Sequence, residues 1–224
     1  MITTDDEEGL NAAIYTELRK RLVTGRLAPG HELSTRSLAA ELNVSQTPVR
    51  DALSRLAADG AVAIRSKRRV RVPPMTVERF EDLLRCRQLL EPEAAVLALP
   101  FMTDAHLAQL KHIDAVLDTA ISRGDAETYM QSNYDFHFTL YRAQGGSTLT
   151  QLIETLWLQF GPYMRLVFGR VSANAPAHDN HQAAIRAIEE RNADALRSAI
   201  GSDISDGMGL LGRAALSLGA SPTP

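Results

Sequence analysis

The spacing of hydrophobic and polar residues predicts two short helices joined by a tight turn within residues 34–56. Hydrophobic residues recur at helical spacing over 36–42, and Asn43 ends this pattern because its side chain tolerates the left-handed backbone conformation. Ser45 or Thr47 can cap a second helix, which has hydrophobic residues on one side and polar residues on the other. The pattern is that of a helix-turn-helix.

The polar side of the second helix has side chains that suit DNA recognition. Amide, hydroxyl and guanidinium groups occur on it from the first turn onward, on Gln46, Thr47, Arg50 and Ser54. Such groups can form paired hydrogen bonds with base edges in a major groove. Spacing alone leaves a second interpretation open, in which the two helices form a simple corner with a solvated polar face.

A stretch rich in Lys and Arg follows the two helices and favours the DNA-binding interpretation. Two short strand-like runs surround a turn within residues 61–72, and five of the seven residues from Arg65 to Arg71 are cationic. A β-hairpin wing would place these cations against DNA phosphates, where counterion release supplies much of the affinity. A basic cluster by itself is commonly solvated surface, so its position beside the helix pair is what indicates DNA.

The remainder of the chain has helical periodicity. A Pro pair marks a linker at 73–75, because proline interrupts both helix and strand. Six helices are expected over 76–216, and residues 217–224 are expected to be a disordered tail. The predicted fold is mostly α. It has an N-terminal winged helix-turn-helix over 1–72, with a small β-hairpin wing, and a C-terminal all-α antiparallel helical bundle able to enclose a small ligand.

Charge is distributed unevenly between these two parts. Residues 1–72 contain 12 Lys and Arg residues against nine acidic residues, whereas residues 73–224 contain 12 against 18. A basic head on an acidic body is typical of a DNA-binding sensor. The single cysteine (Cys86), the acidic N-terminus and the lack of a long apolar stretch argue against a secreted or membrane protein, so we expect a cytoplasmic location.

Residues 10–72 resemble the winged helix-turn-helix of the GntR family of bacterial transcription regulators. The resemblance rests on three motifs, which are Gly-x-Leu-x-Pro-Gly at 25–30, Leu-Ala-x-x-Leu at 38–42 and Val-Ser-x-Thr-Pro-Val-Arg at 44–50. It implies DNA contacts from the second helix, the start of the third helix and the wing tip. With the basic wing, the expected DNA-binding residues are Arg36, Ser45, Gln46, Thr47, Arg50, Ser66, Lys67, Arg68 and Arg69.

Two positions depart from the usual pattern of the GntR family. The family usually has Arg at the position of Gln46 and commonly has Gly at that of Lys67. Glutamine pairs best with adenine, whereas arginine pairs best with guanine. We therefore expect the operator to differ from the one usual for the family.

Four polar residues of the helical region could converge on one point. Asn133 and His137 are four residues apart, so both point to the same side of one helix, while His181 and Asp203 lie on two later helices. Helical bundles form metal sites by bringing together such groups from several helices. Spacing alone does not distinguish this arrangement from chance.

Residues 75–215 resemble the FadR-type C-terminal ligand-binding domain that accompanies this class of GntR head. The motifs are Arg87-x-x-x-Glu91, Phe136-His137 and His181-x-x-x-Ile185-x-x-Ile188. In many members an Asp or Asn and three His residues hold a divalent ion, and the corresponding residues here are Asn133, His137, His181 and Asp203. Because a carboxylate replaces the last His, the set would suit zinc, nickel, manganese or iron.

The resemblance also implies a small carboxylate as the effector, bound at the open positions of the ion. Arg87 is a candidate partner for this anion, since a guanidinium binds a carboxylate through two hydrogen bonds. An ion pair with Glu91, one turn along the same helix, is an equally supported alternative. Arg165 is a further candidate for effector binding.

These features predict a homodimeric transcription regulator that binds a palindromic double-stranded DNA operator. The sequence has no nucleophile–base pair and no phosphate-binding loop, so an enzyme is not expected. Two alternatives stay open. One is a regulator whose metal-free bundle binds an acyl or other apolar effector directly, and the other is a helical metalloenzyme with a DNA-binding head.

Overall fold

The structure is a computed structural model, and it describes residues 4–66, 69–171, 180–210 and 212–213. Two predictions therefore fall outside the described residues. These are the DNA contacts of Lys67 and Arg68 at the wing tip and the state of the tail at 217–224.

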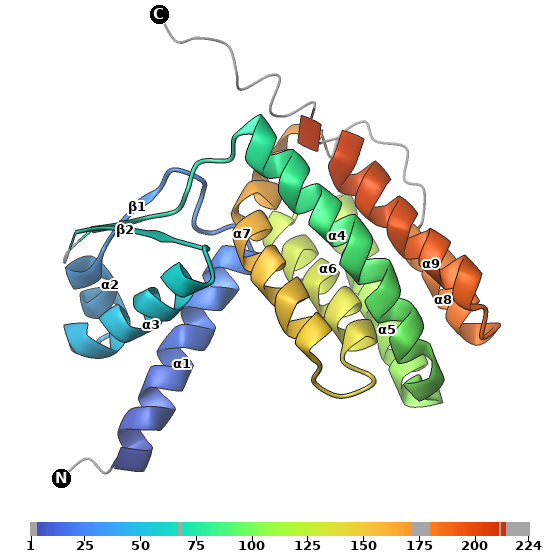
Figure 1. Cartoon of the computed structure of the whole chain (residues 1–224), viewed down its shortest axis with the longest axis horizontal. Coiled ribbons are helices and arrows are strands. Elements are labelled where there is room, and N and C mark those ends of the chain that lie inside the picture. The colour runs from blue at the N-terminus through green and yellow to red at the C-terminus, as the bar shows by residue number, and fades with distance from the viewer. Residues whose placement is uncertain (1–3, 67–68, 172–179, 211, 214–224) are drawn as a thin grey trace, which may run out of the picture. The chain divides into compact units, whose positions relative to one another are not determined.

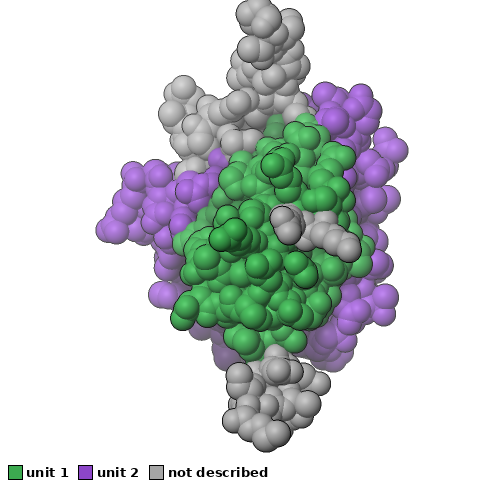
Figure 2. Space-filling view, turned by 90° about the vertical axis from the view of Figure 1, so that its left-hand side faces the viewer, with its two compact units in different colours: residues 1–75, 157–163 green, residues 76–156, 164–224 purple. Residues whose placement is uncertain are grey.

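The chain divides into two compact units, which are coloured separately in Figure 2. Unit 1 comprises Met1–Met75 and Trp157–Tyr163, and unit 2 comprises Thr76–Leu156 and Met164–Pro224. Unit 2 begins at a helix cap, because the Thr76 hydroxyl accepts a hydrogen bond from the backbone N–H of Arg79 at 3.2 Å. The expected linker at 73–75 lies directly before this cap.

Residues 4–75 of unit 1 form three helices and a small sheet (Figure 1). The elements are α1 (Thr4–Val23), β1 (Glu32–Ser34), α2 (Thr35–Glu41), α3 (Gln46–Ala58), β2 (Ala63–Ser66) and β3 (Arg69–Arg71). The pair α2–α3 and the hairpin β2–β3 confirm the winged helix-turn-helix predicted from the sequence. Between the two helices Asn43 has a φ of 54°, the left-handed conformation expected from its residue type.

The sheet has one strand more than the hydrophobic pattern predicts. Its strands are antiparallel in the order β1-β3-β2, with Glu32 opposite Arg71 and Ser34 opposite Arg69. Ser34 also caps α2, because its hydroxyl accepts a hydrogen bond from the N–H of Ser37. The strand β1 therefore joins the start of the helix-turn-helix to the wing.

The core of unit 1 lies largely between α1 and α3, which pack against each other. Its fully buried side chains include Leu18, Leu22, Val49, Leu53 and Leu56. At the edge of this core the Tyr15 hydroxyl donates to Asp59 at 3.2 Å, and the Arg55 guanidinium lies 3.9 Å from the centre of the Tyr15 ring. These contacts fix one side of α3 and leave its other side exposed.

Unit 2 is a helical bundle (Figure 1). Its elements are α4 (Val77–Ala98), η1 (Leu99–Phe101), α5 (Asp104–Arg123), α6 (Ala126–Tyr141), α7 (Thr148–Val171), α8 (Asn180–Glu189), α9 (Ala193–Ser202) and the π-helix η2 (Asp203–Leu210). Within α7, Trp157–Tyr163 are assigned to unit 1. The six α-helices confirm the predicted all-α region. In the part of the chain that the structure describes, none of the helices has the length and apolar character needed to cross a membrane.

The helices pack so that α4, α5, α6, α8 and α9 surround a common interior. The contacts are α5 with α6 and α8, α4 with α6 and α9, and α8 with α9. A tight turn fixes the start of α6, because Gly124 ends α5 with a φ of 65° and the Asp125 side chain accepts the N–H of Thr128 at 3.1 Å. The position of α6 matters because this helix carries Asn133 and His137.

Replacing Gly124 by Ala tests the contribution of this turn. A Cβ at this position would meet nothing within 4 Å, so a loss of stability would come from the left-handed backbone alone. We expect Gly124→Ala to lower the free energy of unfolding by about 1 kcal/mol, measured by urea unfolding with circular dichroism. Gly124→Asn is the matched control and should lose less, because Asn tolerates this conformation. Equal losses from both variants would contradict this explanation.

Candidate functional site

The exposed side of α3 carries the residues predicted to read DNA. The described members of the predicted DNA-binding set are all exposed, and they are Arg36, Ser45, Gln46, Thr47, Arg50, Ser66 and Arg69. Ser45 occupies the N-cap position of α3, but its side chain makes no capping hydrogen bond. Its hydroxyl is thus not used within the helix end, contrary to the capping role considered from the sequence.

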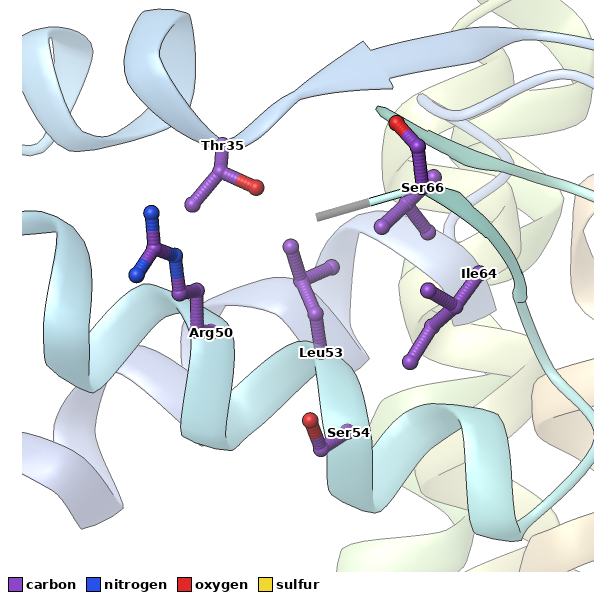
Figure 3. A pocket seen from close by; sticks show the side chains of 7 residues that line it. Thr35, Arg50, Leu53, Ser54, Ile64 and Ser66 are labelled. Atoms are coloured by element: carbon purple, nitrogen blue, oxygen red, sulfur yellow. The ribbon is translucent and has the colours of Figure 1, made fainter. Parts of the chain in front are cut away.

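A hollow of about 370 Å³ lies between α3 and the wing (Figure 3). Its lining residues are Thr35, Arg50, Leu53, Ser54, Ile64, Ser66 and Val70. Figure 3 shows Arg50 on α3 at one side and Ser66 on β2 at the other. Two residues predicted to contact DNA from different elements therefore share one concave surface.

The two described cations of β3 have different roles. The Arg71 Nε donates to the carbonyl oxygen of Gly30 at 3.2 Å, so this side chain holds the loop before β1. Arg69 lies 3.7 Å from the Glu32 carboxylate, and both side chains are exposed. An exposed ion pair contributes little to stability. Arg69 can therefore leave its ion pair with Glu32 and bind a phosphate instead, whereas Arg71 stabilises the loop before β1.

In unit 2 the structure brings His137, His181 and Asp203 together. They come from α6, α8 and the junction of α9 with η2, and their ligand atoms all lie within 4.8 Å of one another. The Nε2 of His137 is 3.2 Å from one carboxylate oxygen of Asp203, and the Nε2 of His181 is 3.8 Å from the other. Both imidazoles are buried, and the Asp203 side chain is 24% exposed.

A chain of buried hydrogen bonds holds the other nitrogen of His137. Its Nδ1 is 3.0 Å from the Tyr141 hydroxyl, which donates to Glu91 at 2.9 Å. The Arg87 Nε also donates to Glu91, at 2.6 Å. Because Tyr141 has only one proton to give, its oxygen is left to accept from the Nδ1–H of His137. The Nε2 of His137 is the nitrogen that faces Asp203.

The ring of His181 is fixed by two neighbours. Phe136 stacks on it with ring centres 3.9 Å apart and planes 10° from parallel. Its Nδ1 lies 3.1 Å from a carboxylate oxygen of Asp114 on α5, whose other oxygen accepts from Gln182. As in His137, the Nε2 is the nitrogen that faces Asp203.

Burial and neighbouring charges set the protonation of this interior. Burial raises the pKa of Asp203, but its hydrogen bond with His137 and its electrostatic interactions with His181, His137 and Arg87 lower that pKa to about 2 overall. Burial, and then the charge of Glu91, raises the pKa of Tyr141 well above its ordinary value. At neutral pH Asp203 is therefore ionised and Tyr141 is a hydroxyl donor.

The donor set fits a divalent cation. Two imidazole nitrogens and a carboxylate oxygen are the ligand types that zinc and related ions take in proteins. Asn133 is buried one turn before His137 on the same side of α6, where its amide oxygen is the fourth predicted ligand. Three or four protein ligands leave open positions for a small molecule.

The two arginines predicted to bind the effector differ in their burial and in their partners. Arg87 is 2% exposed and forms the buried ion pair with Glu91, which was the alternative that the sequence left open. Its charge nevertheless acts on Asp203. Arg165 is half-buried on α7, and its charge acts on Asp125 at the start of α6.

Sequence reasoning did not identify Tyr141 and Asp114 as parts of this site. Tyr141 follows His137 by four residues, so the helical spacing used for Asn133 would have found it. Asp114 lies 67 residues from its partner His181, and no local pattern marks it. Its role depends on the packing of α5 against α8.

Comparison with known proteins agrees with both parts of this description. Residues 10–72 match the model of the gntR family of bacterial regulatory proteins, and residues 82–206 match that of the FCD domain. HTH-type transcriptional regulator McbR of Escherichia coli K12 is 28% identical over 90% of this chain and 92% of the relative. The solved structure of E. coli McbR/YncC matches with a TM-score of 0.86 and 27% identity, over 92% of this chain and 98% of that chain.

Other relatives are also regulators. Uncharacterized HTH-type transcriptional regulator BphR of Paraburkholderia xenovorans is 32% identical over 86% of this chain and 83% of the relative. The gluconate operon transcriptional repressor of Bacillus subtilis is 28% identical over 79% of this chain and 74% of the relative. The relatives and families are those of transcription regulators, not of enzymes. This chain therefore belongs to the GntR family of bacterial regulatory proteins, as a DNA-binding transcription regulator with a C-terminal FCD effector domain.

Proposed function

We propose that this regulator acts in the cytoplasm as a homodimer on a palindromic double-stranded DNA operator. We further propose that a small carboxylate, bound at a divalent metal in the bundle, controls its affinity for that operator. The observation that carries the second part is the convergence of His137, His181 and Asp203 from separate elements of unit 2. The helix-turn-helix and the family support the first part.

On the operator, α3 would lie in a major groove with Gln46, Thr47 and Arg50 near base edges. The remaining residues of the set would bind phosphate or the minor groove, and they are Arg36, Ser45, Ser66, Lys67, Arg68 and Arg69. A twofold dimer would present two such helices to successive grooves, which requires a palindromic sequence. The amide of Gln46 favours an adenine at its contact.

In the bundle, Nε2 of His137, Nε2 of His181 and the Asp203 carboxylate would hold the ion, with Asn133 as a further oxygen ligand. When bound, a zinc, nickel, manganese or iron ion would supply a Lewis acid for the effector's carboxylate. The chain's own residues orient the two imidazoles, which are both buried. Tyr141 and Asp114 do so by accepting the Nδ1 protons.

Arginine side chains would complete the recognition of an anion. Because Arg87 already pairs with Glu91, we propose that it contributes positive charge to the site rather than a direct contact. Arg165 on α7 is the candidate for direct contact with the effector. Effector binding changes operator affinity to the extent that the liganded and free states differ in their affinity for DNA.

Substituting Arg50 tests the assignment of α3 as the recognition helix. Arg50→Ala should weaken specific operator binding by about 1–3 kcal/mol, roughly 5- to 150-fold, measured by fluorescence anisotropy with DNA from the region upstream of its own gene. Arg123→Ala is the matched control, since Arg123 is an exposed arginine at the end of α5 in unit 2. Unchanged binding by Arg50→Ala, or equal losses from both variants, would overturn the assignment.

Metal content tests the proposed centre. Protein purified without a tag or chelator should contain about one divalent ion per chain, measured by mass spectrometry. His137→Ala should lose at least about 100-fold in metal affinity, since loss of a supporting residue alone commonly costs 10- to 100-fold. His112→Ala, which removes an exposed histidine on α5, should retain the ion.

The response to effectors separates the two models of the bundle. A screen of small organic acids should yield one that changes operator affinity only when the metal is present. A response that survives chelation and is unchanged in His137→Ala would rule out the metal-dependent model. It would favour the metal-free regulator with an acyl or other apolar effector.

A further inference from the structure

Asp114 is a buried carboxylate with two hydrogen-bond partners. It lies on α5, is 2% exposed, and accepts hydrogen bonds at both oxygens. Gln182 can only donate through its NH₂ group, so one oxygen of Asp114 is committed to it. The other oxygen is 3.1 Å from Nδ1 of His181. A buried carboxylate needs such donors because burial removes its water.

These contacts leave the His181 ring little rotational freedom. The stack with Phe136 fixes the plane of the ring, and the bond to Asp114 fixes its rotation within that plane. An ionised carboxylate accepts only, so the proton of a neutral imidazole must lie on Nδ1. The lone pair then lies on Nε2, which is 3.8 Å from Asp203. A neutral Nε2 of this kind is a common metal-binding atom.

At His137 the Nδ1 nitrogen has a different partner. There the acceptor is the Tyr141 hydroxyl, which is neutral and is itself held by Glu91. At His181 the acceptor is a carboxylate in direct contact. A charged acceptor makes the imidazole a stronger donor to a metal than a neutral acceptor does. The two imidazoles are therefore inequivalent.

We infer that Asp114 is a positioning residue of the metal centre, which holds His181 in the Nδ1–H tautomer and strengthens Nε2 as a ligand. This inference rests on the proposed metal site. It goes beyond that site by assigning a role to a residue on α5 that is outside the ligand set. The effect of Asp114 should be visible in the ion-free protein as well as in its affinity for metal.

The test substitutes Asp114 by Asn and measures two quantities. The first is zinc affinity, by competition with a chromogenic chelator, which should fall by about 10- to 100-fold.

The second quantity is the His181 tautomer in ion-free protein at about pH 8, where a free imidazole is neutral. Ring ¹⁵N chemical shifts should show a protonated Nδ1 in the wild type. In Asp114→Asn they should show an increased share of Nε2–H, because Asn offers a single acceptor to two donors. Asp104→Asn, an exposed substitution on the same helix, should change neither quantity.

A double variant separates positioning from general damage to the fold. In Asp114→Asn/Gln182→Leu the competing donor is gone, so the Asn oxygen can accept from His181, and the Nδ1–H tautomer should return. The inference would be contradicted if Asp114→Asn lost the Nδ1–H tautomer and the double variant did not recover it. It would also be contradicted if Asp114→Asn kept both the zinc affinity and the tautomer of the wild type. If the wild type binds no zinc, the proposed metal site fails. A wild-type His181 protonated on Nε2 would refute the role of Asp114 on its own.

Discussion

The buried carboxylate of Glu91 organises the interior of the bundle. It accepts hydrogen bonds from Arg87 on its own helix and from Tyr141 on α6, and all three side chains are buried. A buried charge is tolerated only when it is paired and hydrogen-bonded. Because Tyr141 gives its proton to Glu91, its oxygen accepts from His137. The ion pair on α4 thus determines that Tyr141 donates to Glu91, so that its oxygen is left to accept from Nδ1 of His137.

The two units meet opposite physical requirements. DNA binding requires cations and amides that stay exposed until phosphates and bases replace water, and the described members of the DNA-binding set in unit 1 are exposed. The ligand cluster of unit 2 requires side chains whose orientation is fixed in advance, and its two imidazoles are buried and held at Nδ1. The same separation is visible in charge, since the N-terminal part is basic and the C-terminal part is acidic.

Local sequence patterns were sufficient to predict much of this fold. The periodicity of α2 and α3, the left-handed Asn43 and the six helices of unit 2 depend on interactions within a few residues. The strand β1 could not be predicted in this way, because its three residues become a strand only by pairing with β3. His137 and His181 could be proposed because the family resemblance marks their positions, whereas the role inferred for Asp114 depends on the packing of α5 against α8. The sequence allowed both an ion pair and an effector contact for Arg87, and the structure shows the ion pair.

X-ray absorption spectroscopy of the zinc-loaded protein tests the central claim most directly, because it reports the atoms bound to the ion. The account predicts scattering from two imidazoles, with nitrogen at about 2.0–2.1 Å, and oxygen ligands in the remaining positions. A first shell that contains sulfur, or that lacks imidazole scattering, would contradict it.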